Sequence, residues 1–172
     1  LTDLEGLSFP EAVQQIADLA GVPMPQPDVQ AEKREKERAG LIDVKVAPGT
    51  ASWFDGPAMS EAQCAQALNN GARSARDIAA GGARVLGFGE MGIGNTASAS
   101  LITQLLTGAP MADCVGRGTG LDDAALASKK RILGELAAAY CGPRTPFAVL
   151  AQFGGFEIAT MAGAMLGAAQ SR

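Results

Sequence analysis

The fold class expected for this chain rests mainly on residues 83–96, which read Ala83-Arg-Val-Leu-Gly-Phe-Gly-Glu-Met-Gly-Ile-Gly-Asn-Thr96. Residues 83–88 are short, apolar and bounded by glycine, which is typical of a buried parallel strand. A glycine loop, residues 87–95, overlaps the end of this segment and contains Gly87, Gly89, Gly92 and Gly94, and a helix is expected to begin at Thr96. A strand, a glycine-rich loop and a helix in this order predict an α/β layer architecture.

Weaker signals on both sides extend this pattern. Leu41–Val46 is expected to be a second short strand. Ser60 and Gln63 form a capping box, which predicts the start of a helix, and Gly81–Gly82 ends it. Further helices are expected over Thr96–Leu106, Asp123–Tyr140, Pro146–Gln152 and Phe156–Ala169.

The first forty residues differ in character from the rest. Ser8 begins a capping-box helix that ends at Gly21. Gln30–Arg38 is densely charged and has no apolar stripe, which is typical of a solvated helix or tether. We therefore expect an N-terminal helix and charged linker over residues 1–40, followed by a core over residues 41–172.

The composition excludes several classes of function. The 172 residues contain 14 basic and 18 acidic side chains, so a net charge of −4 gives no reason to expect a nucleic acid or an anionic membrane as partner. An apolar fraction of 47% excludes wholesale disorder. The absence of histidine removes His-based triads, His metal sites and imidazole acid–base chemistry from this stretch.

The cysteines give no sign of a disulfide framework or a zinc site. Cys64, Cys114 and Cys141 are odd in number, widely spaced and without a Cys-x-x-Cys pair. We expect all three to be small buried apolar residues in a protein of the reducing cytoplasm.

No segment is expected to cross or target a membrane. Leu1–Phe9 lacks the basic start and the long apolar stretch of a secretory signal. Phe147–Gln170 is apolar, but Glu157 near its centre and the Gly154–Gly155 break favour a buried or partner-facing helix.

The glycine loop is the first candidate site. A loop that opens a helix presents free backbone N–H groups and the positive end of the helix dipole to an anion, and Asn95 is placed to cap that helix. The spacing Gly87-x-Gly89-x-x-Gly92 also matches the dinucleotide fingerprint, so an NAD-dependent oxidoreductase is an alternative. Against it, no strand ending in an acidic residue follows about 20 residues later, and Glu90 is a poor neighbour for a pyrophosphate.

A second glycine cluster lies at Val115-Gly-Arg-Gly-Thr-Gly-Leu-Asp-Asp123. Asp122 is placed to cap the helix that carries Lys129 and Lys130. Arg117 or either lysine is suited to meet a phosphate or to hold Glu90 ionised. Two such loops at the carboxyl ends of strands would form the kind of crevice in which α/β proteins bind ligands.

Several of these motifs resemble one enzyme family. Gly89-Glu-Met-Gly-Ile-Gly-Asn-Thr96, Val115–Asp123 and Gly154-Gly-Phe-Glu-Ile-Ala159 strongly resemble nicotinate-nucleotide–dimethylbenzimidazole phosphoribosyltransferases. Lys45-Val-Ala-Pro-Gly-Thr50 and Gly56-Pro-Ala-Met59 are similar to upstream motifs of the same family. The resemblance covers about Leu41 to Arg172 in order.

The resemblance implies a cytoplasmic homodimer that works without a metal or cofactor in cobalamin lower-ligand synthesis. Such an enzyme moves the 5-phosphoribosyl group of nicotinate mononucleotide to 5,6-dimethylbenzimidazole and releases α-ribazole 5′-phosphate and nicotinate. The implied fold is a Rossmann-like parallel sheet flanked by helices, with a small helical domain built from both chain ends.

The resemblance also assigns roles to residues. Glu90 is the carboxylate beside the ribose and the attacking base, and Lys129, rather than Lys130, is the active-site lysine. The nucleotide-binding residues would be Gly89, Met91, Gly92, Ile93, Gly94, Asn95, Gly116, Arg117 and Gly118.

Some parts of the family pattern have no counterpart here. The main general base of the family lies in a Gly-Glu-Gly-Thr-Gly stretch expected beyond Arg172, and a segment with an Asp-His-Gly motif is missing ahead of Lys45. We therefore expect a partial copy that is inactive by itself, with a non-catalytic nucleotide-binding relative as another alternative. Glu157 is expected to be a buried, paired carboxylate with a structural or pocket-wall role.

Overall fold

The computed structural model describes residues 33–34 and 40–171. The chain divides into two compact units, Leu1–Ile42 and Asp43–Arg172. Of the first unit, only Lys33 and Arg34, which are helical, and residues 40–42 are described. The helix expected to begin at Ser8 and most of the charged run lie outside the described residues.

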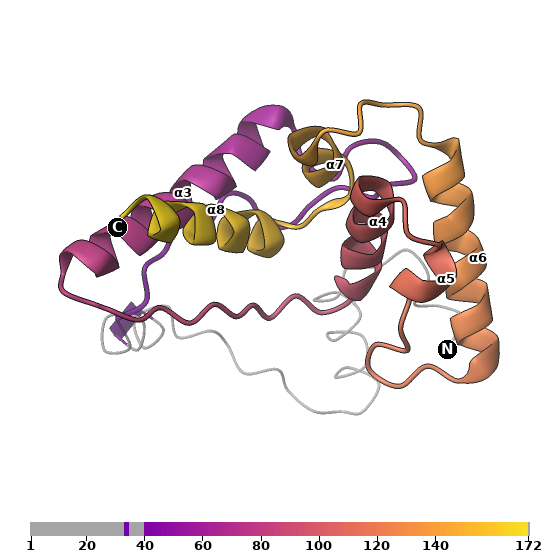
Figure 1. Cartoon of the computed structure of the whole chain (residues 1–172), viewed down its shortest axis with the longest axis horizontal. Helices are drawn as coiled ribbons and strands as arrows, with labels where there is room; N and C mark the ends of the chain where they lie inside the picture. Colours follow the sequence, from indigo (N-terminus) through magenta and orange to yellow (C-terminus); the bar gives the residue numbers. More distant parts are fainter. Residues whose placement is uncertain (1–32, 35–39, 172) are drawn as a thin grey trace, which may run out of the picture. The chain divides into compact units, whose positions relative to one another are not determined.

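The second unit is helical (Figure 1). Its helices are α3 (Glu61–Ala80), α4 (Thr96–Thr107), α5 (Met111–Cys114), α6 (Asp123–Ala139), α7 (Pro146–Phe153) and α8 (Phe156–Gln170). The sequence predicted all of them except the one-turn α5, each to within one residue at either end. Their caps explain this agreement, because Ser60 forms the expected capping box, and Asp122 and Thr145 each accept a backbone N–H three residues ahead.

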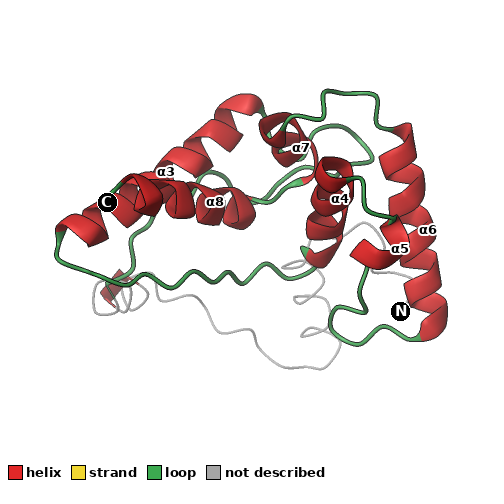
Figure 2. Cartoon of the chain, viewed as in Figure 1, coloured by secondary structure: helices red, strands yellow, loops and turns green. Residues whose placement is uncertain are grey.

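The predicted parallel sheet was wrong for the part of the chain described. Figure 2 shows helices and loops but no strand among these residues. Figure 1 draws residues 83–88 as an extended trace, but neither they nor residues 41–46 pair through backbone hydrogen bonds with another extended segment among the described residues. A strand exists only when another strand pairs with it, and Val85 is instead 88% exposed. The α/β class therefore does not describe this structure.

Helices α3 and α8 pack against each other along their length (Figure 1). Glycines make this close approach possible: a Cβ added to Gly71 would overlap the Thr160 carbonyl oxygen, and one added to Gly163 would overlap that of Leu68. Because the two backbones are in direct contact, α8 is held firmly on α3.

Two small apolar clusters complete the packing. The first joins α4, α5, α6 and α7 and contains Leu101, Leu105, Val115, Leu133, Ala137, Val149 and Phe153. The second, formed by Met59, Cys64, Ala67, Ala151 and Ala159, joins α3 to α7 and α8. Together they fix α4 and α8, the two helices whose first turns border the glycine loop.

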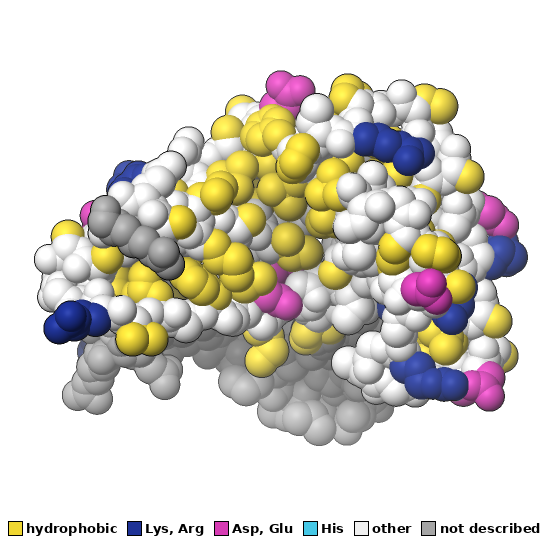
Figure 3. Space-filling view, viewed as in Figure 1, with side chains coloured by type: hydrophobic (Ala, Val, Ile, Leu, Met, Phe, Trp, Pro, Cys, Tyr) yellow, Lys and Arg dark blue, Asp and Glu magenta, His cyan; other side chains and the backbone are white. Residues whose placement is uncertain are grey.

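No described helix is both long enough and apolar enough to span a bilayer. The face that α3 and α8 present in Figure 3 is nevertheless rich in hydrophobic side chains. Met165 and Leu166 on α8 are 46% and 60% exposed.

The expectation that all three cysteines are buried was wrong for two of them. Cys64 is fully buried, Cys114 is half-buried and Cys141 is exposed. Cys141 is exposed because it lies just beyond the end of α6, in the turn that contains Gly142 and Pro143. Burial raises the pKa of the Cys64 thiol, because the thiolate is the form that burial disfavours.

These environments predict different rates of alkylation. At pH 7.5 iodoacetamide should modify Cys141 at least about a hundredfold faster than Cys64, which has to await local opening before it reacts. Peptide mass spectrometry measures both rates on one sample, and addition of urea should make them converge. Equal rates in the absence of denaturant would show that Cys64 is not buried as described.

Candidate functional site

The glycine loop connects the extended residues 83–88 to the first turn of α4. Its last residues form a tight turn in which the Asn95 N–H donates to the Gly92 carbonyl oxygen at 3.1 Å. Gly94 has φ = +87°, a conformation that side-chain-bearing residues rarely adopt. The turn therefore needs glycine at this position, and it brings Asn95 back toward Glu90.

The side chain of Asn95 does not cap α4 as the sequence predicted. Its Nδ2 donates instead to Glu90 Oε2 at 2.7 Å and to Glu157 Oε1 at 3.2 Å. Glu157 belongs to the first turn of α8, 62 residues further along the chain. One carboxamide thus joins the two carboxylates that border the loop.

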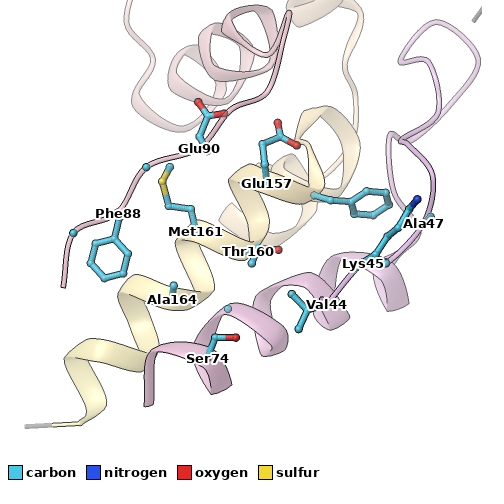
Figure 4. Close-up of a pocket in the computed structure, with 15 residues that line it drawn as sticks. Val44, Lys45, Ala47, Ser74, Phe88, Glu90, Glu157, Thr160, Met161 and Ala164 are labelled. Atoms are coloured by element: carbon cyan, nitrogen blue, oxygen red, sulfur yellow. The ribbon is translucent and has the colours of Figure 1, made fainter. Parts of the chain in front are cut away.

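A cavity of about 460 Å³ lies beside these carboxylates. Its walls come from residues 44–47, α3, the glycine loop and α8. Figure 4 shows Glu90 and Glu157 near one end of it, with Met161 between them and Phe88, which lies further along the loop. An apolar wall with a few convergent polar groups is typical of a small-molecule site.

A second cavity, of about 550 Å³, adjoins the other side of the loop. It is lined by residues 48–54, by Gly92–Asn95 and by the start of α8. Phe156 and Glu157 line both cavities, so they form part of the wall between them. Both volumes lie in the range of ordinary ligand pockets.

A third group of residues surrounds the N-terminus of α4. Lys129 on α6 donates through Nζ to Thr96 Oγ1 at 2.8 Å. Gly118 in the second glycine cluster has φ = +58°, and a Cβ placed there would lie 3.4 Å from Thr96 Oγ1 and 3.9 Å from Lys129 Nζ. The Lys129 ammonium group therefore lies at the positive end of the α4 helix dipole, beside Gly118, which has no side chain. These features favour an anion.

Other predicted site residues have different surroundings. Arg117 forms an ion pair with Asp123 and donates to the Leu121 carbonyl oxygen at 2.9 Å. Met91 and Ile93 are 90% and 92% exposed. Gly89 lines the first cavity, whereas Gly92, Ile93, Gly94 and Asn95 line the second.

Sequence reasoning missed three polar residues of the first cavity, namely Lys45, Ser74 and Thr160. Lys45 belongs to a motif that carries the family resemblance, but nothing in its spacing pointed to the glycine loop. Glu157 was predicted to be a paired wall residue. It does line both cavities, but it is half-buried and its partner is an amide. Among the described residues no group of three acidic or cysteine side chains is arranged to hold a metal ion.

A family model described as a phosphoribosyltransferase matches residues 8–172. Two curated relatives named nicotinate-nucleotide–dimethylbenzimidazole phosphoribosyltransferase come from Dechloromonas aromatica (strain RCB) and Aromatoleum aromaticum (strain EbN1). The first is 60% identical over 139 residues, which is 79% of this chain and 40% of the relative. The second is 56% identical over 135 residues, covering 78% of this chain and 39% of the relative.

The fold is similar to that of a solved protein. The crystal structure of CobT from Thermus thermophilus superposes with a TM-score of 0.69 at 36% sequence identity. The match covers 87% of this chain and 41% of that one. The chain thus spans about 40% of the length of the relatives that it matches.

Proposed function

Because the chain belongs to the phosphoribosyltransferase family whose model it matches, we propose that it carries part of the active site of such an enzyme. The reaction is transfer of the 5-phosphoribosyl group from nicotinate mononucleotide to 5,6-dimethylbenzimidazole. A benzimidazole nitrogen bonds to the ribose anomeric carbon, the bond from that carbon to nicotinate breaks, and the benzimidazole N–H proton is lost. The products are α-ribazole 5′-phosphate, which is an intermediate of cobalamin lower-ligand synthesis, and the released nicotinate.

The nicotinate leaving group needs little help from the protein. It departs from a cationic pyridinium as a neutral ring nitrogen and therefore requires no proton. The ribose carbon gains positive charge in an oxocarbenium-like transition state, which a nearby carboxylate stabilises. Glu90 is assigned this role, because it faces the first cavity and is hydrogen-bonded in place.

The observation that carries the proposal is the position of Lys129 at the N-terminus of α4. The ammonium group, the helix dipole and the unencumbered backbone at Gly118 together suit the 5′-phosphate. Gly116 belongs to the same segment. The backbone of Gly92–Asn95 would form the wall along the nucleotide, as it lines the second cavity.

The remaining roles rest on the family resemblance. Met91, Ile93 and Gly89 would contact the nucleotide from the same loop, and Arg117 would do so after leaving Asp123. The proton of the attacking base would go to a carboxylate in a segment that follows Arg172 in the family pattern. We also propose a homodimer that works in the cytoplasm without a cofactor.

An NAD-dependent oxidoreductase fits the site less well. The Gly87-x-Gly89-x-x-Gly92 spacing would have to receive a pyrophosphate, but two carboxylates border this loop. Their negative charge repels a dianionic ligand. The other alternative is that the chain belongs to a nucleotide-binding protein without catalysis. Such a protein would retain the phosphate site, so only an assay of product formation distinguishes it from the enzyme.

Replacing Lys129 by methionine tests the phosphate site. We expect Lys129→Met to weaken nicotinate mononucleotide binding by about 10- to 100-fold, as expected for loss of a charge-assisted hydrogen bond. Lys130→Met is the matched control, because it removes the same charge from the adjacent position, and it should change affinity by no more than about twofold. Isothermal titration calorimetry measures both.

A second ligand makes this test specific. Nicotinate riboside lacks the phosphate, so its affinity should be the same for Lys129→Met and the unaltered protein. Equal losses for the two ligands, or equal effects of the two lysine variants, would contradict the assignment of Lys129 to the phosphate.

A further inference from the structure

The orientation of the Asn95 carboxamide follows from its two neighbours. Ionised carboxylates accept hydrogen bonds but cannot donate them, so the NH₂ group of Asn95 has to face both Glu90 and Glu157. Each of its two protons is then used by one carboxylate. The side chain that the sequence offered as a helix cap is therefore committed to joining two acidic residues.

Glu157 is the fixed end of this arrangement. It lies in the first turn of α8, and its carboxylate rests against Gly155, the N-cap residue, near the positive end of the helix dipole. Helix α8 is in turn held on α3 through the buried Gly71 and Gly163. The position of Glu157 is thus set by the packed part of the unit rather than by the loop.

Glu90, at the other end of these two hydrogen bonds, is not held by the packed helices. It lies on an exposed, glycine-rich stretch, and within the described residues Asn95 is the hydrogen-bond partner of its side chain. There is little free space around the Glu90–Asn95–Glu157 bridge, the three side chains joined by the two hydrogen bonds of Asn95. A Cβ at Gly92 would overlap Asn95 Nδ2 and would lie 2.7 Å from Glu157 Oε1. Glycine at position 92 lets the three side chains meet.

We infer that Asn95 and Glu157 are positioning residues, which hold the Glu90 carboxylate at a defined place on the cavity wall. This inference rests on the proposed function, in which Glu90 stabilises the developing charge on the ribose. A carboxylate on a mobile loop would have to be ordered during each turnover, whereas a carboxylate tied to α8 is preorganised. Glu157 acts through Asn95 and Glu90 and is not itself assigned a contact with the substrate.

The structural part of the inference is tested by NMR relaxation on the chain. We expect Glu157→Leu to lower the backbone order parameter of Glu90 from about 0.85 to below about 0.6, because Asn95 then no longer ties Glu90 to α8. Glu157→Gln retains an oxygen that accepts from Asn95 and should leave the order parameter unchanged. Glu135→Leu, the same substitution at an exposed site on α6, should also leave it unchanged.

A steric variant tests the same bridge from its other side. Gly92→Ala should displace the Asn95 side-chain NH₂ and shift its NMR signals, whereas Gly87→Ala, where a Cβ meets open space, should not. An order parameter of Glu90 that is unchanged in Glu157→Leu, or Asn95 signals that are unchanged in Gly92→Ala, would overturn the inference.

Kinetics on the protein that carries this chain test its functional part. Glu157→Leu should lower kcat about tenfold and change the KM for nicotinate mononucleotide by no more than about twofold, and Glu157→Gln should restore most of the loss. A rise in KM without a fall in kcat would overturn the positioning role. If the unaltered protein forms no product, the proposed function fails, and the relaxation measurement still decides whether Glu157 orders Glu90.

Discussion

Gly163→Ala is expected to lower the free energy of unfolding by at least about 3 kcal/mol, the upper end of the usual cost of overpacking. The added Cβ would overlap the Leu68 carbonyl oxygen and lie 2.7 Å from Leu68 Cα. These are backbone atoms, so no change of rotamer relieves the clash and α8 has to move away from α3. Urea titration followed by circular dichroism measures the loss.

Gly134→Ala is the matched control for this prediction. Gly134 also lies within a helix, but a Cβ there meets nothing within 4 Å. Alanine should therefore raise the free energy of unfolding by about 0.5–1 kcal/mol through its better helix propensity. Two variants of equal stability would show that α3 and α8 are not in backbone contact. Movement of α8 would also displace Glu157, so Gly163→Ala should disturb the hydrogen bond between Glu157 and Asn95.

Glu90→Gln is expected to lower kcat at least about a hundredfold while nicotinate mononucleotide binding changes by no more than about threefold. The glutamine is nearly the same size and still offers an oxygen to Asn95 Nδ2, so the loop should retain its shape. What is lost is the negative charge, which matters most when the ribose carbon becomes cationic. Steady-state kinetics and calorimetry together separate the two effects.

Glu135→Gln provides the control for this substitution. Glu135 lies on the exposed face of α6, paired with Arg131 one turn away, so both kcat and affinity should be unchanged. Equal losses of turnover and binding in Glu90→Gln would instead show that Glu90 binds the ground state. The role assigned to Glu90 in the transition state would then be wrong.

The helices were predictable because their signals are local. The capping box of Ser60 and Gln63 and the caps at Asp122 and Thr145 each involve residues within one turn, so the sequence alone contains the whole interaction. Glycine at position 108, with φ = +74°, ends α4 in the same local way.

The sheet was not predictable for the opposite reason. Apolar residues bounded by glycine favour a strand, and Figure 1 draws residues 83–88 as an extended trace. Whether such a segment becomes a strand depends on a partner at a distant position, and no described residue supplies one. The local pattern therefore predicted neither the burial nor the pairing of this segment, and the predicted architecture was wrong.

The site residues likewise fall into those that local motifs predicted and those that depend on long-range packing. Glu90 and Lys129 were singled out from motifs, and the structure places one beside a cavity and the other at the N-terminus of α4. The link between Asn95 and Glu157 spans 62 residues and depends on how α8 packs on α3. No spacing rule reaches that far, and the local rule for Asn95 predicted a helix cap instead.

Product formation by the protein that carries this chain tests the central claim most directly. Incubation with nicotinate mononucleotide and 5,6-dimethylbenzimidazole, followed by chromatography and mass spectrometry, should show α-ribazole 5′-phosphate and nicotinate appearing in equal amounts. Tight binding of nicotinate mononucleotide without any α-ribazole 5′-phosphate would contradict the claim and identify the protein as a nucleotide-binding relative that has lost the reaction.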